Sequence, residues 1–550
     1  MIGRRQLVLG SLLSAVAPYS HALPAADPVI ATRAGPVRGR LIDGIQVFTG
    51  IPFAKPPIGE LRFAAPRPAA AWSGVLDASR PAATPPQNID PAIPPVAPIS
   101  EDCLQVNVWA PASAGPHPVL VWIFGGGNQT GASNQTAYQG DTFARDGVVC
   151  VSLNYRVGVL GYLELGRILG PEASGSGNNA LRDQLLALEW VRDNIAAFGG
   201  DARNVTLAGQ SAGAWGVATL MALPAADGLF QRAIVASGNA AGTYSLERAA
   251  DFAELFVKHL GGAVQPARAV HPARAVQPAR AVHPARAVQP ARAVHPARAV
   301  QPARASRLRT APVSELLSAQ QLAQSEFPDL VPFRPVVDGS FLPATPIERF
   351  RAGVAHKVTT LLGHTHDEYR YFRSAAQLGG PLQRNMLATT DPQALAPIVS
   401  AYRAAFPQLT EGERQLKILG AEVFTIPALR IAEALSAHGG TAYLYDIHYP
   451  IANGPFGLAS PHGMDVPLIF DKLDTSFATK VFGYTPQDAP MAKRVHDVWV
   501  SFIKHGTPRI PQLSWPAYEP RHRATMVLAN PPSVVDDTDG VERRIWQGLL

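Results

Sequence analysis

Apolar and polar positions along the chain predict buried strands that alternate with amphipathic helices. Residues 181–198 carry Leu, Val and Ile at helical spacing, which predicts a helix with one buried face. Apolar or β-branched runs, typical of strands covered on both faces, occupy residues 119–124, 148–153, 205–207, 233–236, 358–362 and 442–447. Further helices are predicted at residues 214–223, 312–324 and 491–503. We therefore expect an α/β protein with a central, mostly parallel sheet and helices on both faces.

The run at 205–207 leads into a turn that places a serine between glycines. Gly209-Gln210-Ser211-Ala212-Gly213 separates this strand from the helix predicted at 214–223. A sharp turn of this kind lifts the serine hydroxyl above the sheet edge, and the glycines let backbone approach without Cβ clashes. The five-residue pattern alone is weak, because about a quarter of chains of this composition would contain it by chance. By itself, the pattern therefore leaves the alternative that Ser211 is an ordinary loop serine.

The length and composition of the chain are those of a globular protein. It has 550 residues, 47% hydrophobic and 16% charged. We predict one catalytic domain over residues 23–550, because the strands and helices on either side of the repeat described below form one system. The formal charge of +6 falls to −1 without the seven Arg of that repeat, so no nucleic-acid partner is expected.

The first 22 residues have the pattern of an export signal. Arg4 and Arg5 form a basic start, residues 7–17 are apolar but too short to span a bilayer, and residues 20–22 form a small-x-small cleavage site. Residues 4–8 also resemble a twin-arginine signal. An uncleaved hydrophobic anchor is the alternative. We expect an exported, periplasmic or secreted protein without a transmembrane anchor after cleavage.

Residues 263–304 are seven hexads that alternate Ala-Val-Gln-Pro-Ala-Arg and Ala-Val-His-Pro-Ala-Arg. Proline in every hexad prevents a continuous helix, and one Val per hexad buries too little surface to offset chain ordering. We interpret the insert as a disordered surface loop. A cationic arm that touches polyanions or a membrane surface is the alternative.

Acyl transfer by serine requires a nucleophile, an imidazole base, an acid that orients the base, and N–H donors for the oxyanion. Glycines 125–127 follow the strand at 119–124 and can offer unhindered N–H groups. An acid after the strand at 358–362 and a later His would complete the order Ser, acid, His of α/β-hydrolases. Spacing alone selects neither one of the 15 His nor one acid from Asp367 and Glu368.

Several ordered motifs resemble the type B carboxylesterase family, which includes the cholinesterases and bacterial para-nitrobenzyl esterases. The match runs from about residue 29 to residue 518 and is interrupted only by the repeat. The motifs that carry it are residues 48–54, 56–63, 101–108, 122–127, 154–158, 177–179, 183–184, 198–201, 204–213, 335–339 and 462–465. The resemblance implies the α/β-hydrolase fold and hydrolysis of carboxylic esters through an acyl-enzyme.

Carried over position by position, the resemblance implies a catalytic triad. Ser211 matches the nucleophile, His462 the general base and later general acid, and Glu368 the acid that orients the imidazole. The residues that match the oxyanion donors are Gly126, Gly127 and Ala212. This chemistry needs no cofactor or metal, and no His, Cys and acid cluster has metal-ligand spacing, so neither is expected.

Some positions depart from the family pattern. Phe124 stands where His usually precedes the glycines, and Asn128 stands where an aromatic residue usually follows them. We expect both to shape the substrate pocket, with Asn128 lining its acyl side. Gln210 replaces the commoner Glu, and Tyr369 replaces the Gly that usually follows the triad acid.

The two cysteines also depart from the family pattern. The family's first disulfide joins the Cys of the Glu-Asp-Cys motif to an upstream Cys, but residues 85–87 are Pro-Pro-Gln here. Cys103 is therefore expected to be a free thiol, and Cys150 a buried strand residue.

Other functions remain open beside ester hydrolysis of a small molecule. One is a binding or adhesion protein on the same fold, although the presence of all three triad residues argues against it. Another gives the main role to the Arg-rich repeat as a surface-binding arm, and deletion of residues 263–304 would separate the two. The substrate could also be an amide, a carbamate or a lactone, because the same triad attacks those carbonyls.

Overall fold

The computed structural model describes residues 27–89, 94–261, 302–327, 329, 332–378, 392–452 and 454–549. The predicted signal at residues 1–22 lies outside this range. So does the repeat, except for its last three residues, which begin helix α7 (Pro302–Thr310). None of the helices within the described range is long and apolar enough to cross a membrane.

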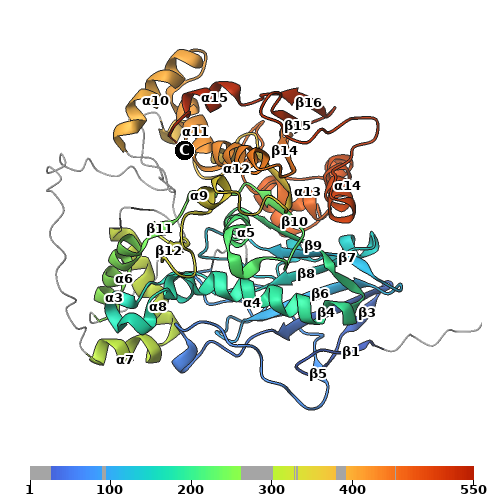
Figure 1. Ribbon diagram of the computed structural model, residues 1–550, viewed down its shortest axis with the longest axis vertical. Coiled ribbons are helices and arrows are strands. Elements are labelled where there is room, and N and C mark those ends of the chain that lie inside the picture. The colour runs from blue at the N-terminus through green and yellow to red at the C-terminus, as the bar shows by residue number, and fades with distance from the viewer. Residues whose placement is uncertain are drawn as a thin grey trace, which may run out of the picture.

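A mixed eleven-stranded sheet forms the centre of the molecule (Figure 1). Its order is β16-β15-β14-β13-β10-β9-β7-β8-β6-β4-β3, and the seven strands from β15 to β8 are parallel. The bounds are β3 Arg40–Ile42, β4 Ile45–Pro52, β6 Gln105–Pro111, β7 His117–Ile123, β8 Val149–Leu153, β9 Gly200–Gln210, β10 Arg232–Ala236, β13 Thr359–Thr365, β14 Ala442–Ile447, β15 Ala524–Leu528 and β16 Ser533–Asp536. Each strand predicted from an apolar run is present. The predicted fold class is confirmed.

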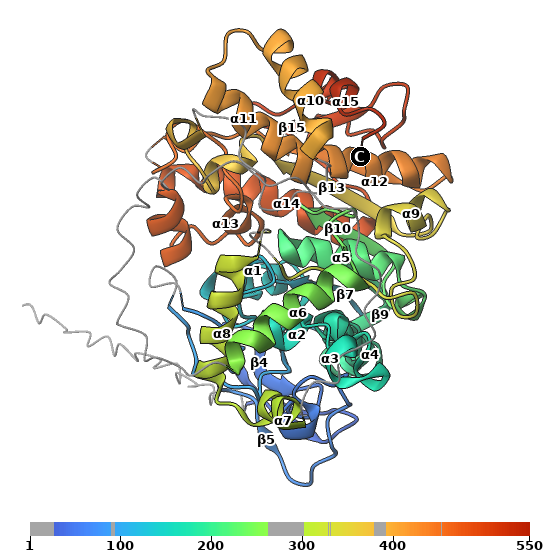
Figure 2. The ribbon, with the colours of Figure 1, turned by 90° about the vertical axis from the view of Figure 1, so that its left-hand side faces the viewer.

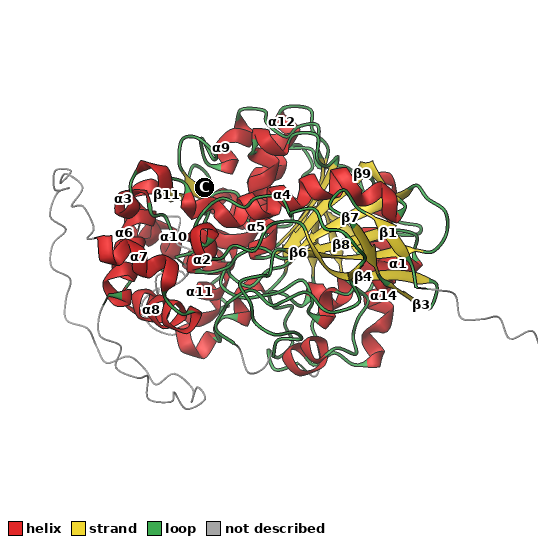
Figure 3. Ribbon diagram, turned by 90° about the horizontal axis from the view of Figure 1, so that it is seen from below, coloured by secondary structure: helices red, strands yellow, loops and turns green. Residues whose placement is uncertain are grey.

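Helices cover both faces of the sheet, which explains why its central strands are apolar along their whole length. Figure 3 shows one layer on each side of the strands. The first layer contains α4 (Asn179–Asn194), α5 (Ala212–Ala222) and α12 (Ile426–Ala437), and the second α1 (Asp141–Arg145) and α14 (Ala489–His505). The predicted helix at 181–198 ends earlier as an α-helix, because its last turn, Ile195–Phe198, is a 3₁₀ helix.

The chain segments before and after the repeat pack against each other. Helix α6 (Leu246–Leu260) precedes the repeat and α8 (Val313–Glu326) follows it, and the two lie side by side in Figures 1 and 2. Strands β11 (Tyr244–Ser245) and β12 (Val336–Val337) pair in parallel next to them. The remaining helices of this region are α2 (Val159–Tyr162) and α3 (Gly166–Leu169). A second group, α9 (Pro346–Arg351), α10 (Pro392–Ala405), α11 (Glu411–Gly420), α13 (Asp465–Ile469) and α15 (Gly540–Ile545), adjoins the later strands.

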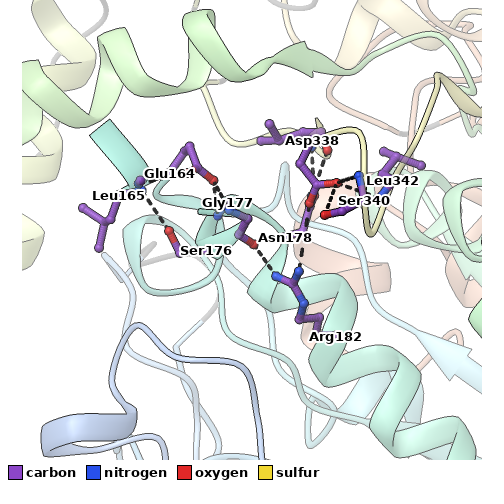
Figure 4. A network of polar contacts seen from close by, with 12 residues as sticks. Glu164, Leu165, Ser176, Gly177, Asn178, Arg182, Asp338, Ser340 and Leu342 are labelled. Carbon is purple, nitrogen blue, oxygen red and sulfur yellow. Dashed lines mark hydrogen bonds and ion pairs between the residues drawn. The ribbon is translucent and has the colours of Figure 1, made fainter. Parts of the chain in front are cut away.

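Two motifs of the family resemblance meet at the start of α4 (Figure 4). The Asn178 amide donates to the carbonyl of Val336 at 2.8 Å and to the Asp338 carboxylate at 3.0 Å, and it accepts from the Val336 N–H at 2.9 Å. Glu164 accepts from the backbone N–H groups of Gly175 and Gly177. These motifs therefore have a structural role, which is to join the segment after the repeat to the start of α4.

A buried ion pair joins two further motifs. The Arg156 guanidinium donates both Nε and Nη2 to the Asp183 carboxylate, at 2.8 and 2.7 Å, and both side chains are at most 1% exposed. Arg156 also donates to the carbonyl of Ala64 at 2.8 Å. The pair holds α4 against the loop that follows β8.

Candidate active site

The turn between β9 and α5 presents Ser211 at the end of the sheet. Ser211 has φ 57° and ψ −128°, a conformation that non-glycine residues adopt only where the surroundings hold it. A Cβ at Gly213 would lie 2.1 Å from the carbonyl oxygen of Ile123, and one at Gly209 would lie 2.5 Å from the backbone of Gly213. The flanking glycines are thus required by close backbone contact, as the sequence pattern predicts.

Side chains from three distant segments meet at this turn. The Ser211 Oγ lies 2.8 Å from His462 Nε2, and His462 Nδ1 lies 2.5 Å from Glu368 Oε2. With the ring proton on Nδ1, His462 donates to Glu368 and accepts from the serine hydroxyl. Of the two acids that spacing leaves open, Glu368 lies against the imidazole, whereas Asp367 accepts from the N–H of Ser460 at 2.9 Å.

Glu368 is held by residues that the sequence analysis did not identify. Its Oε1 accepts from the Ser237 hydroxyl at 2.6 Å and from the Thr365 N–H at 2.9 Å. Ser237 directly follows β10 and has φ 53°. The sequence contains a signal for Ser237, because the strand before it, β10, is predicted and parallel neighbouring strands end at the same edge of a sheet. The residue after β10 therefore lies at the edge where β9 and β13 also end.

The glycine loop after β7 lies next to Ser211, since a Cβ on Gly125 would lie 3.0 Å from the Ser211 Cβ. Gly126 and Gly127 have φ of 118° and 62°, and the N–H groups of Gln129 and Thr130 close the turn on the Gly126 carbonyl. Among the described residues, no hydrogen bond uses the N–H of Gly126 or Gly127. The Ala212 N–H is the first of α5 and has no acceptor within that helix. All three residues line the cavity beside Ser211.

A cavity of about 370 Å³ contains Ser211, His462 and the glycine loop. Its described lining includes no Asp, Glu, Lys or Arg, and it is rich in aromatic rings. Tyr371, Phe372 and Phe424 surround the imidazole, with ring centroids 6.2, 5.3 and 4.7 Å from that of His462. Such a site accommodates an uncharged, largely apolar molecule.

The two predicted pocket residues occupy different environments. Asn128 lines the cavity, but its side chain is buried, donating to the Phe333 carbonyl and accepting from the Tyr162 hydroxyl, both at 2.9 Å. Phe124 is fully buried beneath the glycine loop and is not part of the cavity wall. Its ring stacks on Tyr155 at 4.4 Å, so Phe124 supports the loop from behind.

The other departures also have clear positions. The Gln210 amide lies 3.4 Å from His462 Nε2 and lines the cavity as a neutral group. Tyr369 is buried at the cavity wall and packs on Phe372. Cys103 and Cys150 are both free and buried, as predicted, and burial raises the pKa of each thiol.

The carboxyl group of Asp465 is buried near this site, and the sequence predicted no role for it. Asp465 begins α13, three residues after His462, and neither of its carboxyl oxygens has a hydrogen-bond partner among the described residues. Burial, with the nearby charge of Glu368, raises the pKa of Asp465 to about 7.

Within the described residues, no group of three or more His, Cys, Asp and Glu is placed to hold a metal ion.

Comparison with known proteins identifies the family. The model of the carboxylesterase family matches residues 26–546. The para-nitrobenzyl esterase of Bacillus subtilis (strain 168) is 31% identical over 94% of this chain and 98% of its own, and the phenmedipham hydrolase of Pseudarthrobacter oxydans is 32% identical over 92% and 95%.

Solved structures agree with this family. A structure of PNB esterase superposes with a TM-score of 0.78 at 30% identity, covering 96% of this chain and all of that one. The Geobacillus stearothermophilus carboxylesterase superposes with a TM-score of 0.76 at 33% identity, covering 94% and 100%. The chain therefore belongs to the carboxylesterase family, has the α/β-hydrolase fold, and is a hydrolase of carboxylic esters.

Proposed function

We propose that the protein hydrolyses uncharged carboxylic esters through an acyl-enzyme formed on Ser211. The observation that carries the proposal is the hydrogen-bonded series Ser211–His462–Glu368, at 2.8 and 2.5 Å, at the end of a sheet and inside a cavity. This order of nucleophile, base and orienting acid is the one that acyl transfer by serine requires.

In the proposed first step, the Ser211 oxygen attacks the ester carbonyl while His462 Nε2 takes the hydroxyl proton. Negative charge then develops on the carbonyl oxygen, where the N–H groups of Gly126, Gly127 and Ala212 would stabilise it. Glu368 stabilises the imidazolium and keeps its Nδ1 oriented. His462 next gives the proton to the departing alcohol. A water molecule then attacks the carbonyl of the acyl-enzyme while His462 takes one of its protons. His462 returns this proton to the Ser211 oxygen as the carboxylic acid leaves.

The lining of the cavity supports an uncharged substrate. A charged group would lose its hydration without meeting an opposite charge, since the described lining has no Asp, Glu, Lys or Arg. The relative named phenmedipham hydrolase makes phenmedipham a second substrate to test beside simple esters.

The test compares the wild type with Ser211→Ala on short p-nitrophenyl esters. We expect kcat to fall by about 10⁴-fold to 10⁶-fold in the variant, because the nucleophile is lost while the oxyanion donors remain. Mass spectrometry after treatment with an organophosphate should find one phosphoryl adduct, on the Ser211 peptide of the wild type. Retained turnover in folded Ser211→Ala would exclude this nucleophile.

A further inference from the structure

We propose that Trp215 sets the size of the substrate group that enters the part of the cavity between α5 and the π-helical turn at Ala421–Thr425. This part of the site would favour short or flat aryl groups and reject long or branched ones. The inference rests on the proposed ester hydrolysis at Ser211, and it names a residue that determines the substrate class of that reaction.

Trp215 lies one helical turn beyond the nucleophile. Its N–H donates to the Ser211 carbonyl at 3.0 Å, so the two residues share one face at the start of α5. The indole lines the cavity although only 5% of the residue is exposed. A substrate group that enters this part of the cavity from Ser211 therefore meets the indole.

The indole cannot retreat from the cavity, because backbone lies directly behind it. A Cβ on Gly242 would lie 2.7 Å from Cη2 and from Cζ3 of Trp215, so the outer ring of the indole already contacts the main chain there. The Asn239 side chain fixes this backbone: its Oδ1 accepts from the Gly242 N–H at 3.1 Å, and its Nδ2 donates to the Val423 carbonyl at 2.9 Å. The loop at residues 239–242 and the π-helical turn are thus joined by hydrogen bonds, and together they hold the backbone behind the indole in place.

On its other side, Trp215 continues into an aromatic wall. It packs with Val423 and Phe424. The Phe424 ring lies 4.7 Å from that of His462 and is nearly parallel to Phe372, at 7° and 6.4 Å. Rings in this arrangement offer flat apolar faces on which an aryl group stacks, and because they are closely packed they resist the displacement that a long chain would require.

The test uses two series of uncharged esters with the full-length protein. The first series is p-nitrophenyl esters from acetate to octanoate, and the second is acetate esters of alcohols of increasing size. We expect Trp215→Ala to raise the ratio of kcat/KM for the longest to the shortest ester at least tenfold in one series. A change in the first series would assign this part of the cavity to the acyl group, and a change in the second to the alcohol.

Two variants serve as controls. Trp215→Phe keeps a flat ring and should change the ratio by less than threefold. Trp72→Ala removes an indole that is not part of the cavity lining, where its Nε1 donates to the Pro36 carbonyl at 3.0 Å, and should also leave the ratio within threefold. If Trp72→Ala changed the ratio as much as Trp215→Ala, the specific role of Trp215 would be refuted.

Folding and function are monitored separately. Organophosphate titration counts intact sites in each variant, and Trp215→Leu replaces Trp215→Ala if the smaller residue prevents folding. Unchanged ratios in both series, at wild-type site counts, overturn the inference about Trp215 and leave the proposed hydrolysis intact. A wild type that hydrolyses none of the esters overturns both.

Discussion

Backbone conformation at single residues defines the candidate site as much as side-chain chemistry does. Ser211 and Asn128 both have positive φ, and each is held there by contacts with remote segments. Gly126 has φ 118°, a value that L side chains rarely adopt. The glycine loop therefore depends on the absence of a side chain at a particular position, and not on glycine content in general.

The loop geometry predicts different effects for two neighbouring substitutions. In Gly126→Ala, the new Cβ would lie 2.2 Å from the Thr130 carbonyl oxygen, so the loop must shift and kcat should fall by about 10²-fold to 10³-fold. In Gly127→Ala, the nearest atom would be 3.8 Å away, and the left-handed φ costs only about 1–2 kcal/mol. Its kcat should fall less than tenfold on p-nitrophenyl acetate. Equal losses in two folded variants would show that the close contact with Thr130 does not distinguish the two positions.

At the scale of elements, the site depends on how α4 and α5 are held against the sheet. Several motifs that resemble the family serve this purpose and not catalysis. Asn178 and Asp338 join the start of α4 to the segment after the repeat, and Arg156 and Asp183 join the helix to the loop after β8. The second pair is the more buried, and breaking it leaves a cation without a partner.

We expect Asp183→Asn to lower the free energy of unfolding by about 3–5 kcal/mol, because a buried Arg156 would lose its counter-charge. The matched control is Asp497→Asn, which breaks the exposed pair with Lys493 on α14 and should cost less than about 1 kcal/mol. Urea unfolding followed by circular dichroism measures both. A loss at Asp183 no larger than that at Asp497 would show that the buried pair contributes no more than a surface pair.

At the scale of the whole molecule, a charge cluster ties the C-terminal segment to the sheet behind Glu368. His364 on β13 is buried between Asp446 on β14 and Asp539 at the start of α15, with nitrogen–oxygen distances of 3.8 and 3.7 Å. Burial by itself lowers the pKa of His364, but the two carboxylates outweigh burial and raise it to about 10. Protonated His364 thus stabilises the contact between segments that lie more than 170 residues apart in the chain.

This raised pKa predicts a loss of stability in alkali. The stabilisation is complete below the unfolded-state pKa of about 6.5 and is lost as the pH rises through about 10. The thermal midpoint of the wild type should therefore fall more steeply between pH 7 and pH 10.5 than that of His364→Gln. Parallel curves for the two proteins would show that His364 does not carry the effect.

Local patterns in the sequence were enough to predict six strands of the parallel part of the sheet (β7, β8, β9, β10, β13 and β14), four helices (α4, α5, α8 and α14) and the serine turn, but not the antiparallel strands at the two edges. Periodicity of apolar residues and glycines at close contacts are properties of short segments, so they can be interpreted without knowing the rest of the chain. The choice of His462 and Glu368 came from resemblance to the family, since spacing left several histidines and two acids open. The free state of Cys103 also followed from sequence, because its usual partner position holds no cysteine.

Tertiary structure alone decided which side chains surround the reacting groups. Ser237 reaches Glu368 across 131 positions of sequence, and Trp215 packs with Phe424 of the π-helical turn that Asn239 binds through Val423. Phe124 and Asn128, predicted together as pocket residues, separate into a support behind the loop and a buried hydrogen-bonded group. Contacts of this kind depend on how distant segments pack, and the periodicity of any one segment carries no information about them.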